Sequence, residues 1–315
     1  MSIQVFSNYQ EIKGVTDLVL TIGTFDGLHL GHVAVLENLT EKAKSIHGQT
    51  GVLSFYPHPR KVLNPQSDNL KLLQSLPEKT HRLDELNIQN LILLPFTVEF
   101  SHLSSTEFIE KILVNYLNIK HIAIGYDHHF GRSRSGGLDE LIALGKIHHF
   151  GVSEIPVYQI NQVNISSTKI REALAAGSVT TAYQYLGYRY SISGKVVRGN
   201  QIGRKIGFPT ANILPEDPDK LIPALGVYAI WVIWNQKRYP AVLNIGTRPT
   251  FNGQNVQIEA HLINFEQDLY DQSLTIEFID FIRPQQRFET VDKLIAQIQE
   301  DIIVSQHKLS DFQNS

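Results

Sequence analysis

Thr21-Ile-Gly-Thr-Phe-Asp-Gly-Leu-His-Leu-Gly-His32 is the stretch of sequence that decides the fold of the first half of the chain. The apolar residues 18–22 predict a buried strand, and Gly23 and Gly27 allow the tight turn that follows. After Gly31 a helical period begins, in which Leu, Leu, Ala and Ile at positions 36, 39, 43 and 46 share one face. A strand, a glycine turn and a helix start present backbone N–H groups and a positive dipole end to an anion.

The two histidines of this stretch, His29 and His32, are three residues apart, so they share one face if the helix has begun by His29. Two imidazoles beside a helix N-terminus suit a phosphate that gains charge during a reaction. Two other interpretations stay open: the pair only packs or caps the helix, or it binds zinc. Zinc has little support, because the chain has no cysteine and no third ligand stands nearby.

Length and composition predict a globular protein of two domains. The chain has 315 residues, of which 42% are hydrophobic. The net charge of −3 gives no overall basic surface for nucleic acid, so local groups must hold any anionic substrate. Without cysteine there are no disulfides, thiolate metal sites or cysteine nucleophiles. We find neither a signal peptide nor an apolar stretch of membrane-spanning length, and therefore expect a cytoplasmic protein with no nucleic-acid or membrane partner.

Strand and helix patterns alternate through the first half of the chain. Predicted strands at 50–55, 91–94, 121–125 and 152–157 follow the one at 18–22, and predicted helices at 78–86, 104–117 and 138–149 lie between them. This alternation predicts an α/β domain with a doubly wound parallel sheet and right-handed crossovers. Sheets of this kind bind ligands at the carboxyl ends of their strands.

Polar loops follow two of these strands. Pro57-His58-Pro59 interrupts regular structure after the strand at 50–55, and a glycine-rich loop at 125–137 follows the fourth strand. The sequence Asp127-His128-His129 in that loop suggests a metal, but neighbouring residues of an extended chain point to opposite sides, which argues against a shared ion. The loop is then either a wall of a ligand pocket or a solvated turn.

A second phosphate signal is Ile165-Ser-Ser-Thr-Lys-Ile-Arg171, at the start of a helix. No Glu or Gln stands three residues after the serines or the threonine, so no capping box occupies their hydroxyls. Ser167, Thr168 and Arg171 are therefore available to a polyphosphate beside a helix dipole. The alternative is a plain Ser/Thr cap with a surface arginine.

The pattern changes after a helix at 179–186 that ends at Gly187. Short alternating segments at 190–197, 226–233, 239–245, 256–264 and 274–281 predict an antiparallel β-barrel, followed by an amphipathic helix near 290–308. We place the domain boundary so that residues 1–187 form the α/β domain and residues 188–315 form the barrel.

Polar chemistry in the second half centres on residues 199–212, Gly-Asn-Gln-Ile-Gly-Arg-Lys-Ile-Gly-Phe-Pro-Thr-Ala-Asn. Glycines four residues apart, at 199, 203 and 207, with Arg204 and Lys205 between them, predict a flap that contacts phosphate. The stretch is not a Walker A motif, because the GK[ST] ending is absent. Thr210 and Asn212 project to the same side of an extended segment and offer hard oxygen ligands for Mg²⁺.

The sequence resembles a known enzyme family along essentially its whole length. The pattern GxFDGxHxGH at 23–32 and ISSTxIR at 165–171 are similar to the two signatures of nucleotidylyltransferases, and the longer form resembles the bacterial bifunctional riboflavin kinase/FMN adenylyltransferase family. That family has PHP preceded by an acidic residue, where this chain has Tyr56. In its GxDFxFG segment Asp127 and Phe130 match, whereas His128 and His129 depart, and Arg134 matches in the basic, glycine-containing segment that follows.

The second half carries the same resemblance. Residues 199–212 are similar to the riboflavin kinase signature GxxxGxxxGFPTAN, and Glu259 and His261 match its ExH strand. Asp271 stands where the family tends to have glycine. Arg283-Pro284 followed by Phe288 resembles the closing RP…F segment of the family.

The resemblance implies two reactions. In the barrel, Mg-ATP would phosphorylate riboflavin to FMN with release of ADP, and in the α/β domain FMN and a second ATP would give FAD and pyrophosphate. Glu259, His29 and His32 would be catalytic, and Thr210 and Asn212 would hold Mg²⁺. The implied ATP and phosphate contacts are Gly23, Phe25, Asp26, Gly27, Gly31, Ser167, Thr168, Arg171, Gly203, Gly207, Thr210 and Asn212, and the implied flavin contacts are His58, Asp127, Phe130, Arg134 and Arg283.

Two other functions stay open. A nucleotidylyltransferase with another phosphate acceptor would not need the fused barrel. A flavin-binding protein without activity would not need His29, His32, Thr210, Asn212 and Glu259 together.

Overall fold

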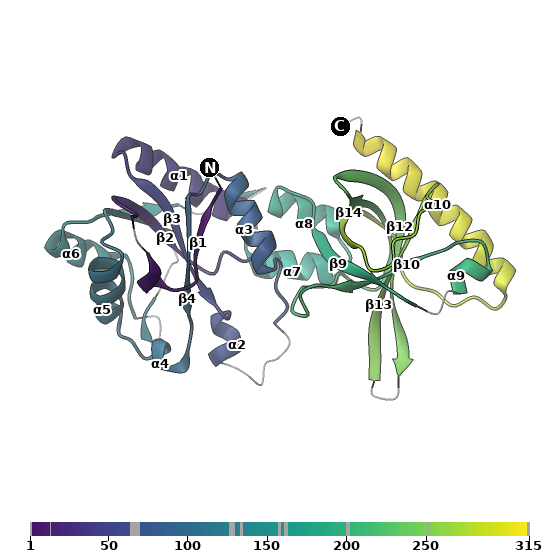
Figure 1. Cartoon of the computed structure of the whole chain (residues 1–315), viewed down its shortest axis with the longest axis horizontal. Coiled ribbons are helices and arrows are strands. Elements are labelled where there is room, and N and C mark those ends of the chain that lie inside the picture. The colour runs from purple at the N-terminus through teal and green to yellow at the C-terminus, as the bar shows by residue number, and fades with distance from the viewer. Residues whose placement is uncertain are drawn as a thin grey trace. The chain divides into compact units, whose positions relative to one another are not determined.

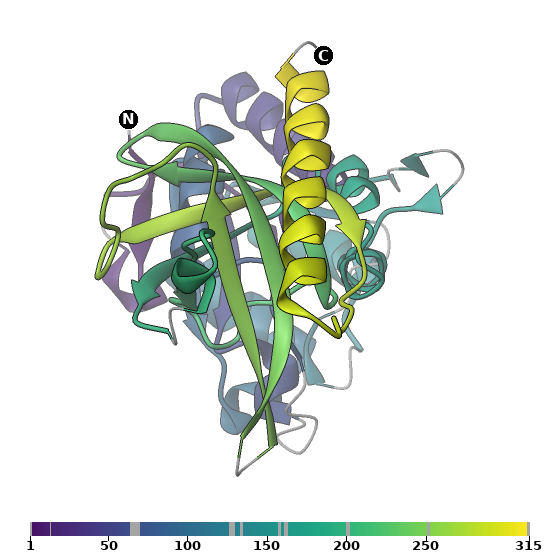
Figure 2. The same ribbon diagram turned by 90° about the vertical axis from the view of Figure 1, so that its right-hand side faces the viewer.

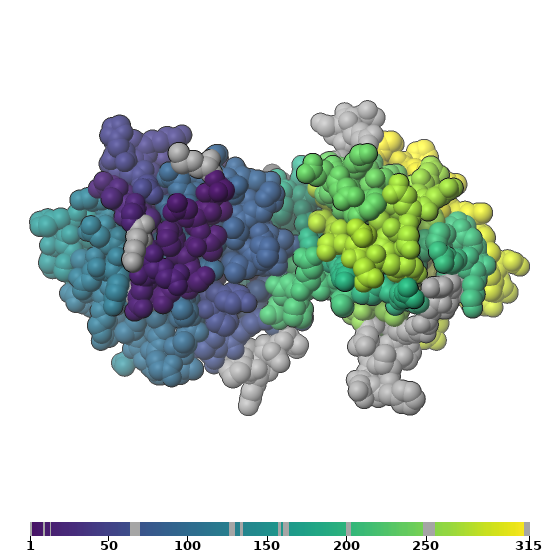
Figure 3. All heavy atoms as spheres, viewed as in Figure 1, coloured from purple at the N-terminus to yellow at the C-terminus, as the bar shows by residue number. Residues whose placement is uncertain are grey.

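The computed structural model describes residues 2–12, 14–63, 70–125, 130–132, 135–156, 159–160, 163–199, 202–250 and 253–313. The chain divides into two compact units, Met1–Ser166 and Ser167–Ser315. Figure 3 shows the surface residues on one side of the two units, coloured by residue number.

The first unit is built around a six-stranded sheet (Figure 1). The strand order is β1-β4-β3-β2-β5-β6 and every pairing is parallel, which confirms the predicted parallel α/β architecture. Its elements are β1 (Gln4–Phe6), η1 (Tyr9–Glu11), β2 (Leu18–Ile22), α1 (Leu30–Ser45), β3 (Gln49–Tyr56), α2 (Pro59–Leu63), α3 (Leu76–Glu85), β4 (Asn90–Pro95), α4 (Val98–Ser101), α5 (Ser105–Phe108), the π-helical η2 (Ile109–Tyr116), β5 (His121–Gly125), α6 (Leu138–His148), β6 (Gly151–Ile155), β7 (Gln159–Ile160) and β8 (Val163–Asn164).

Helices cover both faces of this sheet. Side chains alternate along β2, so Leu18 and Leu20 pack in one apolar core while Val19 packs in the other. The first core contains residues of α5, η2 and α6, and the second contains Leu36 and Leu39 of α1. All three β2 residues are fully buried, as expected for a central strand covered on both sides. The sheet is therefore doubly wound, as the sequence predicts.

The strand order reverses direction beside β2. The chain proceeds outward from β2 to β3 and β4, and then returns to place β5 on the other side of β2. The carboxyl edge at such a switch point is where open α/β sheets bind ligands. The turn that follows β2 is the stretch at 23–32, so the topology places the two histidines at this position.

The second unit contains a closed barrel, and the long helix α10 lies against it (Figure 2). The strand order is β10-β13-β12-β11-β14-β9, with antiparallel pairing throughout, and α10 packs against β11, β12 and β14. Its elements are α7 (Ser167–Ala175), α8 (Val179–Leu186), β9 (Ser191–Val197), α9 (Ile202–Lys205), β10 (Ala211–Pro215), β11 (Gly226–Trp234), β12 (Lys237–Thr250), β13 (Gly253–Leu262), β14 (Ser273–Arg283) and α10 (Val291–Gln313).

Several short elements were not predicted, among them α2, α4, α9, β7 and β8, and three further details differ from the sequence predictions. Strand β1 was not predicted, because it has three residues and joins the sheet only by pairing with β4. Strand β10 was predicted only as an extended segment. Ile46 is 36% exposed rather than buried, because α1 ends at Ser45 and the backbone of Ile46 leaves the helical conformation.

Candidate active sites

The turn between β2 and α1 has an unusual backbone. Phe25, Gly27 and Leu28 have φ angles of +46°, +89° and +36°, which lie in the left-handed region. For the two non-glycine residues this conformation costs roughly 1–2 kcal/mol each. Both are almost fully buried and so are held by packing, and a Cβ at Gly23 would lie 3.0 Å from the Phe25 ring. The sequence Gly23-x-Phe25 thus folds the ring back onto the turn.

His29 is the N-cap of α1, and its ring stacks on that of His32. The helix begins at Leu30 rather than by His29, but the two rings still lie side by side, with centroids 3.6 Å apart and an interplanar angle of 18°. The backbone N–H of His32 donates to Nδ1 of His29 at 3.3 Å. Because Nδ1 accepts this bond, the proton of neutral His29 is on Nε2, where it can be donated to a ligand.

Both imidazoles are neutral at pH 7. Burial lowers the pKa of His29 to about 4. The pKa of His32 lies well below its ordinary value, first because of burial and then because of nearby His29 and Lys79. The two rings therefore act as hydrogen-bond donors rather than as resident positive charges.

The low pKa of His29 makes the stability of the first unit depend on pH. Its pKa is 6.5 in the unfolded chain and about 4 in the folded one, so below pH 6.5 the unfolded state takes up a proton first. We expect roughly 3 kcal/mol of stability, present above pH 6.5, to be lost as the pH falls towards 4. Chemical denaturation at pH 7 and pH 4.5 measures this loss.

His29→Gln is the control for that prediction, since glutamine does not titrate. His32 and His121, whose pKa values burial also lowers, contribute the same trend in both proteins. The variant should therefore lose clearly less stability on acidification than the parent chain. Equal losses in the two proteins would contradict the assignment to His29.

Asp26 and Lys79 hold this turn from the side of α3. The Asp26 carboxylate accepts from the backbone N–H groups of Leu73 and Gln74, and the residue is only 2% exposed. Lys79 Nζ donates to the Thr24 carbonyl oxygen at 2.7 Å. Burial lowers the Lys79 pKa, and the Asp26 carboxylate opposes that shift. The Asp26 carboxylate therefore fixes the turn, and its predicted contact with ATP stays a prediction.

Other residues predicted for the first site have local structural roles. His58 Nδ1 accepts from the Arg60 backbone N–H at 3.2 Å at the start of α2. The Phe130 ring is 7% exposed and packs on Phe108 in an apolar core. Asp127 and Arg134, with His128 and His129, lie outside the described residues, so their predicted roles stay predictions.

The second signature, at 165–171, falls at the division between the compact units. Ser167, Thr168 and Arg171 lie in α7, within the second unit, and Ser167 is the first residue of this helix. Helices α7 and α8 pack together, and α8 packs on β14. The predicted phosphate contacts of these three residues stay predictions.

A pocket of about 420 Å³ lies on the outer face of the barrel. Along β13, Glu259 and His261 line it, whereas Ile258 and Ala260, which alternate with them, are buried on the other side of the strand. Leu294 and Ile298 of α10 also line the pocket. It therefore lies between the barrel wall and this helix.

The polar groups of the pocket come from one row of residues that pair directly across neighbouring strands of the barrel. Asn212 of β10 pairs directly with Glu259 of β13, and Glu259 pairs in turn with Asn244 of β12. The row continues through Val227 to Arg283, because Val227 pairs with both Asn244 and Arg283. All five residues line the pocket. Directly paired residues project to the same face, so the register brings the predicted Asn212 and Glu259 together.

Thr210 and Asn212 could hold a magnesium ion beside Glu259. Both line the pocket, and a Cβ on Gly199 would overlap the Asn212 amide, so glycine at this position leaves room for that side chain. In the part of the chain that the structure describes, no three His, Cys, Asp or Glu side chains form a metal-binding group. The donors present are hydroxyl and amide oxygens, which suit Mg²⁺ that takes its other ligands from phosphates and water.

His261 of β13 holds the flap, residues 203–210, through a hydrogen bond and a ring contact. Its Nδ1 lies 2.8 Å from the Pro209 carbonyl oxygen, and because a carbonyl only accepts, Nδ1–H is the donor. The His261 ring also meets the Phe208 ring edge-on at 5.6 Å. Gly207 has φ of +90°, which glycine adopts readily, and it allows the reversal before Phe208. Gly203, Phe208 and Thr210 thereby reach the pocket.

Sequence reasoning missed three residues of these sites. Lys79 lies in a helix whose sequence is that of an ordinary surface helix, and no neighbouring residue in the sequence indicates a role for it. Asn244 interrupts the apolar strand at 241–245, which was a usable signal. Asp301 lies between Ile298 and Ile302 on the apolar stripe of α10, where a charged residue requires a partner.

These two sites define a protein of the nucleotidyl- and phosphotransferase class. A sequence model described as FAD synthetase matches residues 12–169, and one described as riboflavin kinase matches residues 186–309. A bifunctional riboflavin kinase/FMN adenylyltransferase of Listeria monocytogenes is 36% identical over 284 residues, and that of Escherichia coli K12 is 37% identical over 284, each alignment covering 90% of both chains. The chain therefore belongs to the family of bifunctional riboflavin kinase/FMN adenylyltransferases.

A solved structure shares the whole fold. It is described as a macrolide-efflux protein from Streptococcus pneumoniae and is 30% identical, with a TM-score of 0.89 over 97% of this chain and 99% of the other. In the described part of the present chain, every helix is too short or too polar to cross a membrane.

Proposed function

We infer that this chain makes FMN from riboflavin and ATP in its barrel, and then FAD from FMN and a second ATP in its α/β unit. The family membership supports both reactions. The observation that carries the proposal is the direct pairing of Glu259 with Asn212 in the barrel pocket, with Thr210 beside them. A carboxylate next to two hard oxygen donors suits transfer of a phosphoryl group to a hydroxyl.

In the kinase reaction Glu259 would orient the riboflavin 5′-hydroxyl and accept its proton. Thr210 and Asn212 would hold Mg²⁺ together with the ATP phosphates, and the ion would neutralise phosphate charge there. The flap residues Gly203 and Phe208 would close over the phosphates and exclude water. Such transfers depend mostly on positioning and on charge neutralisation.

Adenylyl transfer needs different groups. The attacking FMN phosphate is already anionic, so no general base is required. His29 would donate its Nε2–H to the α-phosphate of ATP, with His32 stacked beside it and the N-terminus of α1 adding its dipole. Ser167, Thr168 and Arg171 are our proposed contacts for the β- and γ-phosphates that leave as pyrophosphate.

Incubating the purified protein with riboflavin and Mg-ATP and separating the flavins by chromatography tests this proposal. FMN should appear first and FAD after it. A nucleotidylyltransferase with another acceptor would form neither flavin product, and a flavin-binding protein without activity would bind riboflavin unchanged. Absence of both products would refute the proposed function. FMN without FAD would refute its adenylyl-transfer half.

Gly203→Ala should damage only the kinase. A Cβ at this position would overlap the Phe208 carbonyl oxygen, so the flap must move away from the pocket. We expect at least about a tenfold lower rate of FMN formation, since misplacement by about 1 Å can cost a hundredfold. FAD formation from supplied FMN should be unchanged. Both rates can be followed by chromatography.

Gly207→Ala is the matched control for this variant. Nothing lies within 4 Å of a Cβ at Gly207, so this substitution strains the backbone without an overlap. It should slow FMN formation less than Gly203→Ala does. If Gly203→Ala forms FMN at the parental rate, the flap does not have the proposed role.

A further inference from the structure

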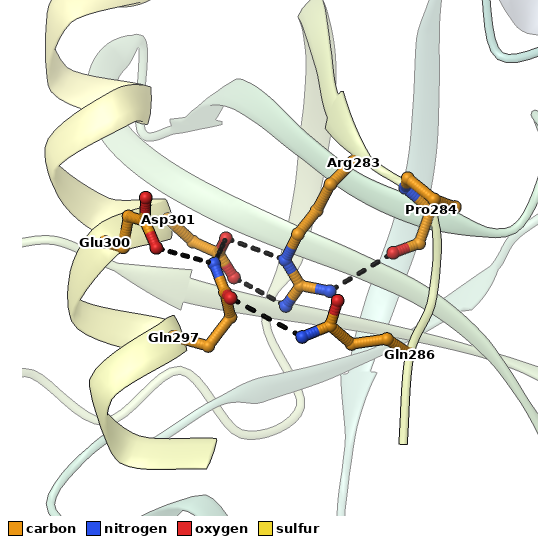
Figure 4. A network of polar contacts seen from close by, with 6 residues as sticks. All are labelled: Arg283, Pro284, Gln286, Gln297, Glu300 and Asp301. Atoms are coloured by element: carbon orange, nitrogen blue, oxygen red, sulfur yellow. Dashed lines mark hydrogen bonds and ion pairs between the residues drawn. The ribbon is translucent and has the colours of Figure 1, made fainter. Parts of the chain in front are cut away.

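Arg283 and Asp301 form a two-point ion pair at one end of the barrel pocket (Figure 4). Arg283 Nε donates to Oδ1 of Asp301 and Nη2 donates to Oδ2, both at 2.8 Å. Nη1 donates to the Pro284 carbonyl oxygen at 3.1 Å. Each guanidinium nitrogen therefore donates within the chain, and Asp301 is only 3% exposed. This fork geometry fixes the plane of the guanidinium more firmly than a single contact would.

The pair joins the two ends of the segment that closes this side of the pocket. Arg283 is the last residue of β14, and Asp301 lies three turns into α10. Gln286 of the intervening segment donates to Gln297, which donates to Asp301 at 3.2 Å (Figure 4). The Arg283 guanidinium also lies 5.7 Å from the centre of the Phe288 ring. Segment 284–290 and the start of α10 are thus held as one wall.

That wall is the apolar side of the pocket. Phe288, Leu294 and Ile298 line it, with Val227 and Val242 of the barrel. The hydroxyl, amide and carboxylate groups of Thr210, Asn212 and Glu259 lie on strands β10 and β13, or beside them. A flat, largely apolar ring system suits the apolar side formed with α10, and phosphates suit the polar side at β10 and β13.

We propose that Arg283 and Asp301 are positioning residues of the kinase, which set the affinity for riboflavin by fixing segment 284–290 and α10 before the substrate arrives. This inference rests on the proposed function. It changes the role expected from the sequence, in which Arg283 contacts the flavin itself. With the pair intact, the wall that receives the ring is already ordered, and ordering it at binding is avoided. Glu259 and the metal-binding oxygens do not depend on the pair.

Asp301→Asn and Arg283→Lys test this role. Asparagine removes the charge and one acceptor site, and lysine keeps the charge but cannot make the two-point contact. We expect the KM for riboflavin to rise at least tenfold in Asp301→Asn and several-fold in Arg283→Lys. The kcat and the KM for ATP should change less than threefold. Quenching of riboflavin fluorescence, titrated in the presence of Mg-ADP, should give the same ratios for Kd.

Lys308→Gln is the matched control. Lys308 of α10 pairs with Asp280 of β14, so this variant also breaks an ion pair between helix and barrel, but neither partner lines the pocket. Its KM for riboflavin should remain within twofold of the parent value. FAD formation from supplied FMN reports in each variant that the chain has folded. Should Asp301→Asn fail to fold, Arg283→Lys carries the same test.

Three results would overturn the inference. The first is an unchanged KM for riboflavin in a folded Asp301→Asn or Arg283→Lys protein. The second is a loss of kcat with unchanged KM, which would make the pair part of the chemistry. The third is a rise of the KM for riboflavin in Lys308→Gln equal to that in Asp301→Asn, which would show that any ion pair between α10 and the barrel has the same effect. Absence of FMN formation by the parent chain would instead refute the proposed function itself.

Discussion

Replacing His29 with alanine is expected to slow FAD formation at least about a hundredfold while FMN continues to form from riboflavin. The side chain supplies an N–H donor at the switch point of the α/β sheet, and its low pKa keeps the ring neutral with Nε2–H free of the helix cap. Removal of one positioned donor of this kind typically lowers a rate 10²–10³-fold. The kinase pocket lies wholly in the barrel unit, so its rate should be unaffected. Chromatography of both flavins measures the two rates in one reaction.

His29→Asn separates catalysis from helix capping. Asparagine is among the best N-cap residues, so it can still accept from the His32 N–H, whereas alanine costs about 1 kcal/mol of capping. Both variants should lose FAD formation, but only the alanine variant should also lose stability. His47→Ala, at the end of α1, is the control for removal of a histidine. Loss of FMN formation in a folded His29→Asn protein would contradict two independent sites, and FAD formation at the parental rate would remove His29 from the mechanism.

Periodicity was sufficient to predict most of the fold because most of the predicted strands of the sheet are buried and apolar along nearly all of their length. Strand β5 begins and ends where the sequence predicts, and α8 ends at Gly187, whose φ of +77° is the left-handed helix end expected of glycine. Strands β1 and β10 escaped prediction for a physical reason. The three residues of β1 and the five of β10 bury little apolar surface by themselves. These segments form strands only because β4 pairs with β1, and β9 and β13 pair with β10.

Some site residues were also predictable from the sequence, and others were not. His29, His32 and Glu259 were predictable because motif spacing follows helix and strand geometry, and the structure brings His29 to His32 and Glu259 to Asn212. Spacing cannot reveal which side chains a residue meets across the fold. The motif does not reveal that the Asp26 carboxylate accepts from the backbone of residues 73–74, about fifty positions along the chain.

Arg283 shows the same limit. Its motif suggested a contact with the flavin, and only the packing of α10 against β14 supplies Asp301 as its partner. A charged residue within an apolar helical stripe was the available signal, but the sequence does not say which cation it meets.

Glu259→Gln should remove FMN formation while FAD still forms from supplied FMN. Glutamine keeps the size of the side chain and an acceptor for the 5′-hydroxyl, but it cannot take the proton. General-base catalysis by a positioned side chain contributes typically 10²–10⁴-fold, and we expect kcat for FMN formation to fall by about that factor. The KM for ATP should change little, because Thr210 and Asn212 remain on their own strand segment.

The control for this variant is Glu277→Gln, the same substitution on β14. Glu277 pairs with Arg238 and does not line the pocket, so its loss should leave both activities near those of the parent. The pH profile adds a test that a structural role would not pass. If Glu259 is the base, the acidic limb of kcat for FMN formation should disappear in Glu259→Gln and persist in Glu277→Gln. A variant that keeps the parental kcat would show that the hydroxyl proton leaves by another route, and a parallel loss of FAD formation would show that the chain is misfolded. Only a selective loss of kcat, with the acidic limb removed, assigns the carboxylate to proton transfer.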